Sequence, residues 1–194
     1  MAKLPISQRW TSADLALLPD NGKRYEIIDG ELYVSRQPHA YHQAVCTALT
    51  IALGEWSRAT HSGLTIIAPG LVFAEDDDVV PDLVWISRER FATAVDESGH
   101  LREAPDLAIE VLSPGWSNEQ RDREVKRKLY SRRGVLEYWI VDWRARRIDV
   151  FRRRESGLEL VQSLNEADQL ESPILPGFSL AVHEIFADVP QSAT

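Results

Sequence analysis

Two acidic side chains stand in stretches that are otherwise apolar. Asp82 lies within Val79–Ile86 and Glu110 within Leu107–Leu112. Runs that are apolar on both faces are typical of buried central strands. Burial of an isolated carboxylate costs several kcal/mol, so such a group shifts its pKa, pairs with a cation or binds a metal. Two strands that each carry one acid therefore indicate a divalent-metal site that could hydrolyse a phosphoester.

Purely structural explanations stay open for each acid. Pro81 could mark an edge or the first residue of its strand, which would leave Asp82 nearer solvent than the pattern suggests. Glu110 could pair with one of the chain's many arginines. A suitably placed lysine would favour the metal site over both explanations.

Such a lysine lies on a predicted helix. Asp122, Lys126 and Tyr130 are spaced i, i+4 and i+8 within Glu119–Arg132, beside an apolar stripe. We expect Lys126 at the margin of the core, within reach of the sheet's carboxylates, where its ammonium could neutralise phosphate or orient an attacking water. The alternative is an ordinary surface pair of Asp122 and Lys126, worth a few tenths of a kcal/mol.

The types of residue favour a hard cation. Carboxylates without a cluster of Cys or His suit Mg²⁺ or Mn²⁺ rather than zinc, and these ions can clamp the attacking and leaving oxygens of a phosphodiester. Cys46 is the only cysteine, and we expect it to be a small buried hydrophobe. His39 and His42 have a weak metal-ligand spacing, and two solvated histidines near a helix start are the favoured interpretation of the pair. Neither a G-x-S-x-G nor a Walker-type motif occurs.

The elements that must position these residues can be read from periodicity. Asp29-Gly30 joins two strand-like runs over Arg24–Val34, a strong signal of a β-hairpin. The spacing of apolar residues predicts helices, and short apolar runs predict strands. We expect an α/β or α+β domain on a mixed sheet, with helices over Ala40–Ala59, Arg88–Val95 and Glu119–Arg132, the last ended by Gly134, and strands over Leu64–Ala68, Leu71–Ala74, Val79–Ile86, Leu107–Leu112, Glu137–Asp142, Arg147–Phe151 and Leu158–Leu164.

The chain's size and composition are those of one globular domain. Its 194 residues are 44% hydrophobic and 27% charged, so we expect a single domain over 1–194 with its core at about 24–186. No apolar run approaches the roughly 18 residues that span a bilayer, and residues 1–8 lack the apolar stretch of a signal peptide. We expect a cytoplasmic protein without an internal disulfide.

Charge is unevenly distributed along the chain. The formal net charge of −8 argues against a protein that coats nucleic acid by charge alone. Residues 117–154, however, hold 13 Lys and Arg against 6 Asp and Glu. This segment of the chain could face a phosphate backbone, and the alternative is a solvated basic face.

The order of these motifs resembles a known family. Val80-Pro81-Asp82, the stretch Pro105–Pro114, Asp122-x-x-x-Lys126-x-x-x-Tyr130 and Gly134–Asp142 together are similar to the Uma family of restriction-endonuclease-like proteins. This family is a branch of the PD-(D/E)xK nuclease superfamily. The resemblance runs from the hairpin to about Phe151, and more loosely to Pro176–Phe178.

The resemblance implies a restriction-endonuclease-like fold, namely a mixed central β-sheet flanked by helices, with an N-terminal β-hairpin. It implies that Asp82 is the aspartate of the PD motif and Glu110 the first acid of the (D/E)xK element. Leu112 stands where that element's lysine would be, and Lys126 matches a lysine that has migrated to a helix. The resemblance also assigns His42 on the first long helix and, less directly, Glu31 in the hairpin to the site.

We therefore expect a Mg²⁺- or Mn²⁺-dependent DNA endonuclease. Asp82, Glu110 and a backbone carbonyl near Val111 would bind the metal, while Lys126 would stabilise charge and position water, assisted by His42. A double-strand cut needs two sites, which favours a homodimer. The alternatives are a catalytically inactive DNA-binding or assembly module, and a metal-dependent phosphodiesterase acting on RNA. The residues expected to contact nucleic acid are Trp116, Arg121, Arg123 and Lys128, with Asp122 and Tyr130 as further members of the site.

Overall fold

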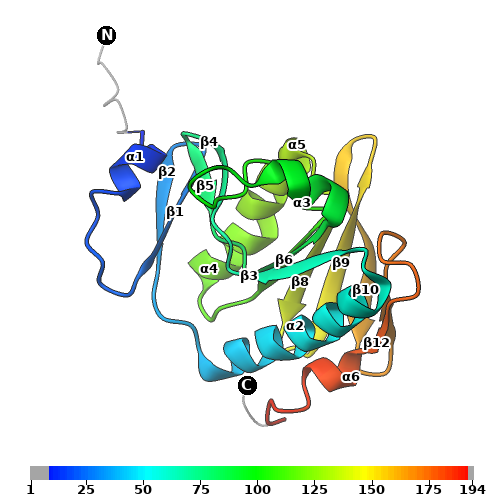
Figure 1. The fold of residues 1–194 in the computed structure, drawn as a ribbon. Coiled ribbons are helices and arrows are strands. Elements are labelled where there is room, and N and C mark those ends of the chain that lie inside the picture. Colours follow the sequence, from blue (N-terminus) through cyan, green and yellow to red (C-terminus); the bar gives the residue numbers. More distant parts are fainter. Residues whose placement is uncertain (1–8, 192–194) are drawn as a thin grey trace.

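The computed structural model describes residues 9–191, apart from the side chains of residues 116 and 117. Helical segments separate groups of strands along this part of the chain (Figure 1). The helical segments are α1 (Ser12–Leu15), α2 (Ala40–Thr60), α3 (Arg88–Ala94), α4 (Trp116–Gln120), the π-helix η1 (Arg121–Lys126), α5 (Arg127–Arg133) and α6 (Val182–Ile185). The strands are β1 (Arg24–Ile28), β2 (Glu31–Ser35), β3 (Gly63–Ile67), β4 (Leu71–Ala74), β5 (Asp77–Val79), β6 (Leu83–Ser87), β7 (Leu107–Val111), β8 (Glu137–Asp142), β9 (Arg147–Arg154), β10 (Gly157–Asn165), β11 (Gln169–Glu171) and β12 (Ser179–Ala181).

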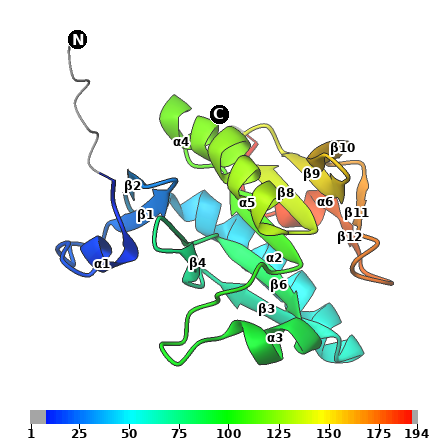
Figure 2. The ribbon, with the colours of Figure 1, turned by 90° about the horizontal axis from the view of Figure 1, so that it is seen from above.

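A six-stranded mixed sheet forms the centre, in the order β10-β9-β8-β7-β6-β3. Only β7 and β8 pair in parallel, and the other neighbours are antiparallel. A parallel pair needs a crossover, which α4, η1 and α5 supply (Figures 1 and 2). The expected mixed sheet flanked by helices is confirmed.

Each face of the central sheet carries its own apolar core. On one face, Leu49 and Leu53 of α2 belong to a buried cluster with Trp85 of β6. On the other, Leu129 of α5 belongs to a second cluster with Val84 of β6. Neighbouring residues of β6 point to opposite faces, so this strand is buried on both sides, as its apolar run predicts.

The hairpin belongs to a smaller sheet with the order β2-β1-β5-β4. Asp29 and Gly30 form its turn with φ values of 53° and 76°, the left-handed conformation that a two-residue hairpin turn needs. The hairpin expected at Asp29-Gly30 is therefore confirmed. Figure 1 shows this sheet beside the helical crossover, at the side of the larger sheet.

The run Val79–Ile86, expected to be one strand, is divided between the two sheets. β5 ends at Val79 in the small sheet and β6 begins at Leu83 in the large one. Pro81 has no N–H and cannot donate to a strand ladder. The backbone N–H of Val80 instead donates to Glu26 Oε1 at 2.9 Å. Asp82 therefore lies where the two sheets separate.

The crossover helix covers the expected range but changes its winding. Residues 121–126 form a π-helix between two α-helical segments, and Gly134 ends the helix at φ 96° as expected. Arg121, Asp122 and Lys126 are all buried in the π-helical turn. π-helical turns are rare and are frequent at functional sites.

The C-terminal part adds elements that the sequence did not predict. β11 and β12 form a two-stranded antiparallel sheet, and Val182 and Ile185 of α6 join the core on the α2 side. No helix within residues 9–191 is both long enough and apolar enough to cross a bilayer.

Candidate active site

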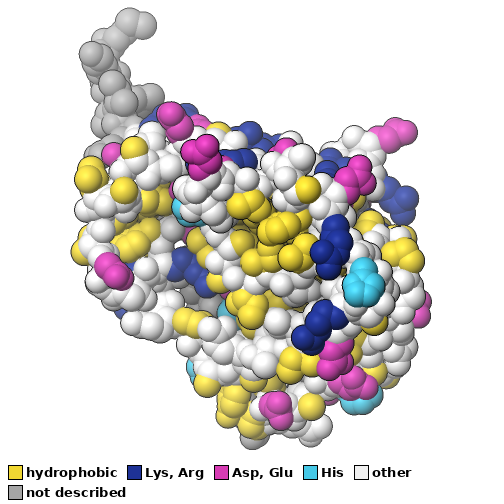
Figure 3. All heavy atoms as spheres, in the orientation of Figure 1, with side chains coloured by type: hydrophobic (Ala, Val, Ile, Leu, Met, Phe, Trp, Pro, Cys, Tyr) yellow, Lys and Arg dark blue, Asp and Glu magenta, His cyan; other side chains and the backbone are white. Residues whose placement is uncertain are grey.

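A cavity of about 310 Å³ opens where the small sheet meets the large one. Figure 3 shows the surface hollowed between the small-sheet side and the main body, with basic side chains inside the hollow. The lining residues come from the hairpin, the start of α2, the β5–β6 junction, the end of β7 and η1. They include Lys23, Arg24, Arg36, His42, Asp82, Glu110, Val111, Arg121 and Asp122.

Asp82 is held at the start of β6 by contacts to both of its carboxylate oxygens. Oδ2 accepts hydrogen bonds from the backbone N–H of Val111 at 2.9 Å and from His42 Nε2 at 3.1 Å. Oδ1 accepts one from Arg24 at 3.0 Å. The register of β6 and β7 ends at Leu83 and Ile109, so the Asp82 carboxylate takes the place of the next backbone acceptor. Its position is fixed by the sheet itself.

Glu110 lies at the end of β7 and is bonded through one oxygen only. Its Oε1 accepts from Lys126 Nζ at 2.9 Å and from the Tyr130 hydroxyl at 2.8 Å. Within residues 9–191, its other oxygen makes no hydrogen bond, and Glu110 lines the cavity. This leaves a carboxylate oxygen with lone pairs that a ligand could use.

Glu26 of β1 is a third acid that the sequence analysis missed. Its Oε1 lies 2.8 Å from Lys126 Nζ, while Oε2 is buried without a hydrogen-bond partner and lies 3.7 Å from Arg121. The signal was present, because Glu26 is the one acid in the otherwise apolar run Tyr25–Ile28. The same criterion singled out Asp82 and Glu110.

Asp122 and Arg121 add a fourth acid and its partner. Arg121 Nε donates to Asp122 Oδ1 at 3.0 Å, and a second guanidinium nitrogen reaches the Ser35 hydroxyl at 2.6 Å. Asp122 is 1% exposed and Lys126 is fully buried. A solvated surface pair of Asp122 and Lys126, the alternative left open above, is therefore wrong.

Burial and mutual repulsion move the pKa values of these acids apart. Burial, with the nearby charges of Asp82 and Asp122, raises the pKa of Glu110 to about 8 despite the attraction of Lys126. Burial also raises the pKa of Asp122. For Asp82, burial acts in the same direction but is outweighed by the hydrogen bond and charge of His42, so its pKa lies below the usual range. Neighbouring carboxyls in distinct protonation states are typical of functional sites.

The pKa values of the buried cations Lys126 and His42 are also raised, but here the cause is the neighbouring carboxylates and not burial. Burial would lower the pKa of Lys126, but the charges of Glu110 and Glu26 raise it above its ordinary value. The pKa of His42 is likewise raised, because its hydrogen bond to Asp82 outweighs burial. In both side chains the neighbouring carboxylates favour the protonated form.

The structure brings most of the predicted site residues together. Asp82, Glu110, His42, Val111, Arg121 and Asp122 line one cavity, and Lys126 and Tyr130 bind Glu110 from behind it. Lys126 does reach the sheet's carboxylates, but it is fully buried beneath them rather than at the margin of the core. His42 is 3% exposed, so its reading as a solvated histidine is wrong.

Three other predicted residues lie elsewhere. Glu31 is exposed and accepts a hydrogen bond from the Tyr33 hydroxyl at 3.0 Å. Arg123 pairs with Asp142 and Asp149. Lys128 is exposed beside a different cavity near the start of β10. The side chain of Trp116 lies outside the part that the structure describes.

The basic stretch 117–154 is largely neutralised within the fold. Arg144 pairs with Glu119 at 2.6 Å, and Arg152 pairs with Glu137 at 2.9 Å. Most of its other arginines also bind carboxylates or backbone carbonyls. By contrast, Lys23 and Arg36 at the cavity are exposed, and neither makes an ion pair within residues 9–191. The hairpin, rather than this stretch alone, supplies cations to the site.

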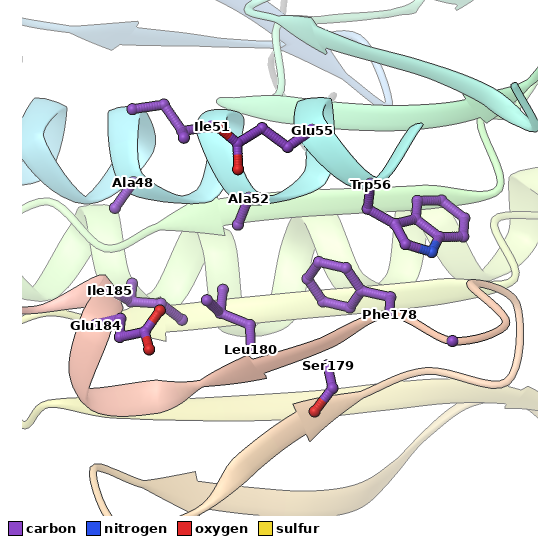
Figure 4. A pocket seen from close by; sticks show the side chains of 11 residues that line it. Ala48, Ile51, Ala52, Glu55, Trp56, Phe178, Ser179, Leu180, Glu184 and Ile185 are labelled. Atoms are coloured by element: carbon purple, nitrogen blue, oxygen red, sulfur yellow. The ribbon is translucent and has the colours of Figure 1, made fainter. Parts of the chain in front are cut away.

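A cavity of about 460 Å³ between α2 and residues 177–185 has a different character. Figure 4 shows its apolar wall, with Trp56 of α2 near Phe178 and with Glu55 and Glu184 at the sides. No Lys, Arg or His lines it. A lining of apolar and acidic side chains without a cation does not suit a negatively charged phosphodiester.

We call the cavity lined by Asp82, Glu110 and Asp122 the acidic cavity. Its donor atoms fit a hard divalent cation. Carboxylate oxygens are the ligands that Mg²⁺ and Mn²⁺ prefer, and Glu110 has an oxygen without a hydrogen bond. His42, Cys46 and Asp82 also present one donor atom each within 4.8 Å of one another. Because the hydrogen bond to Asp82 raises the pKa of His42 and burial raises the pKa of the Cys46 thiol, proton loss from either donor is disfavoured and the carboxylates are the better ligands.

The mixed central sheet flanked by helices is a nuclease-like fold. The chain belongs to the Uma2 family, described as "Putative restriction endonuclease", which it matches over residues 12–183. No curated protein matches the chain.

One solved structure agrees with the chain in fold. A crystal structure described as a putative nuclease belonging to DUF820, from Anabaena variabilis ATCC 29413, superposes with a TM-score of 0.72. The two chains are 18% identical, and the match covers 91% of this chain and 97% of the other. The type IIG restriction endonuclease BpuSI gives a TM-score of 0.41 at 16% identity, covering 76% of this chain and 15% of that one, too low a similarity to bear on the fold.

Proposed function

We propose that this protein is a metal-dependent DNA endonuclease. Asp82 and Glu110 would hold Mg²⁺ or Mn²⁺, with the Val111 carbonyl as a further ligand. The observation that carries the proposal is the convergence of Asp82, Glu110 and Asp122 on one cavity, with Lys126 buried directly behind Glu110. A purely structural network of ion pairs would not need the opening to solvent through which Asp82, Glu110 and Asp122 line the cavity.

The bound ion would polarise the scissile phosphate and lower the pKa of a water molecule. The chain's own residues hold the two metal-binding carboxylates in position. His42 and the Val111 N–H fix the Asp82 carboxylate, while Tyr130 and Lys126 fix Glu110. Lys126 thus supports charge at the site by acting through Glu110, which refines the role that the sequence suggested.

Cations at the cavity rim would bind the phosphate groups of the DNA backbone. Lys23, Arg24, Arg36 and Arg121 line the cavity beside the acids, and Arg24 is only partly buried, so it can exchange Asp82 for a phosphate. Phosphate contacts of this kind position a nucleic acid without reading its sequence. A cut in both strands would need two such sites, for which a homodimer is the simplest arrangement.

Cleavage of supercoiled plasmid in Mn²⁺ or Mg²⁺ tests the proposal. We expect Asp82→Asn and Glu110→Gln to reduce the rate at least about a hundredfold, since metal-ion catalysis contributes several kcal/mol. Asp149→Asn is the matched control, because Asp149 is a buried acid of the same sheet that does not line the cavity. Mn²⁺ should raise the melting temperature of the wild type and of Asp149→Asn, but not of Asp82→Asn.

Two results would contradict the proposal. Equal cleavage by the wild type and both acidic-site variants would remove these residues from the chemistry. DNA binding by a wild type that neither cuts nor responds to Mn²⁺ would favour a binding or assembly module of the same fold. Competition between DNA and RNA substrates separates a DNA endonuclease from a phosphodiesterase acting on RNA.

A further inference from the structure

A second cavity of about 520 Å³ adjoins the acidic one. The two share lining residues from the segment that joins the hairpin to α2, together with Ser113 after β7. Its volume lies within the range of about 300–1,000 Å³ that small-molecule sites occupy. No acidic residue lines this second cavity, which is formed by Val34, Ser35, Arg36, Gln37, Pro38, His39, Ser113, Pro114 and Asn118.

The imidazole of His39 forms a fixed aromatic wall. Its ring stacks on Trp143 with centroids 5.2 Å apart and an interplanar angle of 18°. Its Nδ1 accepts a hydrogen bond from the backbone N–H of Tyr41 at 3.2 Å, which caps α2. The ring also contacts Tyr41, with centroids 5.0 Å apart and an interplanar angle of 48°. Because His39 is nevertheless exposed and lines the cavity, part of its ring is accessible to a ligand.

Two polar side chains complete the cavity. The Asn118 amide nitrogen donates to the Pro114 carbonyl at 3.0 Å, which orients the amide and leaves its oxygen as an acceptor. Arg36 lies where the two cavities join, is exposed, and makes no ion pair within residues 9–191. The cavity therefore offers an aromatic face, a hydrogen-bond acceptor and a cation.

We propose that this cavity binds one nucleotide, with its base unpaired, next to the phosphate held in the acidic cavity. The base stacks on His39, the Asn118 oxygen accepts from a base amino group, and Arg36 binds the intervening phosphate. A base inside a duplex cannot reach such a pocket, so the substrate presents a bulged, flipped or single-stranded nucleotide. The inference rests on the proposed function, since it names the form of nucleic acid that the same site takes.

Binding of labelled DNA, measured by fluorescence anisotropy with Ca²⁺ in place of Mg²⁺, tests this inference. The probes are a duplex with one bulged nucleotide and the matching perfect duplex. We expect the wild type to bind the bulged duplex about tenfold more tightly, as stacking of one base on an aromatic side chain allows. Wild-type binding that does not distinguish the two probes would overturn the inference.

Two substitutions of His39 separate stacking from helix capping. His39→Asn keeps a cap acceptor but removes the ring, whereas His39→Phe keeps a ring but removes the acceptor. We expect His39→Asn to lose the preference for the bulged duplex and His39→Phe to retain it, although His39→Phe should melt at the lower temperature. Loss of the preference in the more stable variant cannot come from unfolding. Retention in His39→Asn, or equal loss in both variants, would overturn the inference.

Failure of this inference is distinguishable from failure of the proposed function. The binding measurement needs no cleavage, so a preference that depends on the His39 ring in a protein that cuts nothing would support the nucleotide site alone. Metal-dependent cleavage by a wild type without that preference would support the nuclease alone.

Discussion

Lys126 is the buried cation that pairs with both Glu26 and Glu110. Its ammonium lies 2.8 Å from Glu26 Oε1 and 2.9 Å from Glu110 Oε1, and the side chain is fully buried. Without that cation, neither of the two buried acids would have an ammonium partner to stabilise a negative charge. Lys126 therefore stabilises the fold and the site through the same contacts.

Replacement of Lys126 tests this at the scale of one residue. We expect Lys126→Met to lower the free energy of unfolding by about 3–5 kcal/mol, because it leaves Glu26 and Glu110 buried without a shared cation. Lys128→Met, two residues along on the exposed face of the helix, should change it by less than about 0.5 kcal/mol. Unfolding in urea measures both.

The double variant Glu26→Gln/Lys126→Met, compared with the two single variants, gives a thermodynamic cycle for the free energy of unfolding. Since it removes one carboxylate together with the cation, it should be more stable than Lys126→Met alone. Additive losses of stability would mean that Lys126 and Glu26 do not interact energetically.

Single residues also show what the sequence could and could not predict. An acid alone in an apolar strand identified Asp82 and Glu110, and the structure places both at one cavity. Glu26 satisfies the same rule, but the hairpin pattern of β1 does not reveal that it faces Lys126 across the boundary between the sheets. Periodicity gives the face on which a side chain lies, whereas its partner depends on tertiary packing.

At the scale of elements, the sequence predicted the hairpin, the long helices and most strands, but not where one sheet ends and the next begins. Val79–Ile86 is continuous in hydrophobicity, so nothing in its pattern assigns its two ends to separate sheets. Pro81 is the physical cause of the break. The π-helical turn also has no sequence signal that we recognise, although it is where Arg121, Asp122 and Lys126 become buried.

Asp77 joins the small sheet to the crossover helix. It lies on β5, and its carboxylate binds Arg132 at 2.7 Å and also Arg133. Burial would raise its pKa, but the hydrogen bonds from Arg132, from the Asp29 N–H and from Arg133 lower it below the usual value. This contact therefore helps to keep β1, which carries Glu26, beside Lys126.

The lowered pKa of Asp77 predicts a dependence of stability on pH. The contact contributes fully above the unfolded-state pKa of about 3.9 and is lost as the pH falls through the lower folded-state value. We expect Asp77→Asn to be less stable than the wild type at pH 7, with the difference shrinking towards zero in acid. Urea unfolding over a pH series measures it, and a difference independent of pH would contradict the role of the ionised carboxylate.

For the whole molecule, the charge distribution in space differs from that along the sequence. The excess of Lys and Arg in residues 117–154 suggested a phosphate-binding surface, yet many of these arginines are paired with acids that the fold brings to them. Lys23 and Arg36, from a part of the chain without such an excess, remain available beside the acidic cavity. Counts over a window cannot show which charges are neutralised by distant partners.

The salt dependence of DNA affinity should therefore depend on Lys23 and Arg36, the two cations that flank the hairpin (the hairpin cations). Each phosphate contact contributes about 0.9 to the slope of log K against log salt concentration. We expect Lys23→Ala and Arg36→Ala each to lower the slope by roughly that amount. Anisotropy titrations at several salt concentrations, with Ca²⁺ present to prevent cleavage, give the slopes.

Arg144→Gln is the control for this measurement. Arg144 belongs to the basic stretch but pairs with Glu119 at 2.6 Å, so its removal releases few counterions from DNA, and the slope should stay at the wild-type value. A slope that falls in Arg144→Gln but not in the two hairpin variants would place the DNA on the surface of residues 117–154. The acidic cavity would then lie away from the bound backbone, since the rim cations that surround it would contact no phosphate.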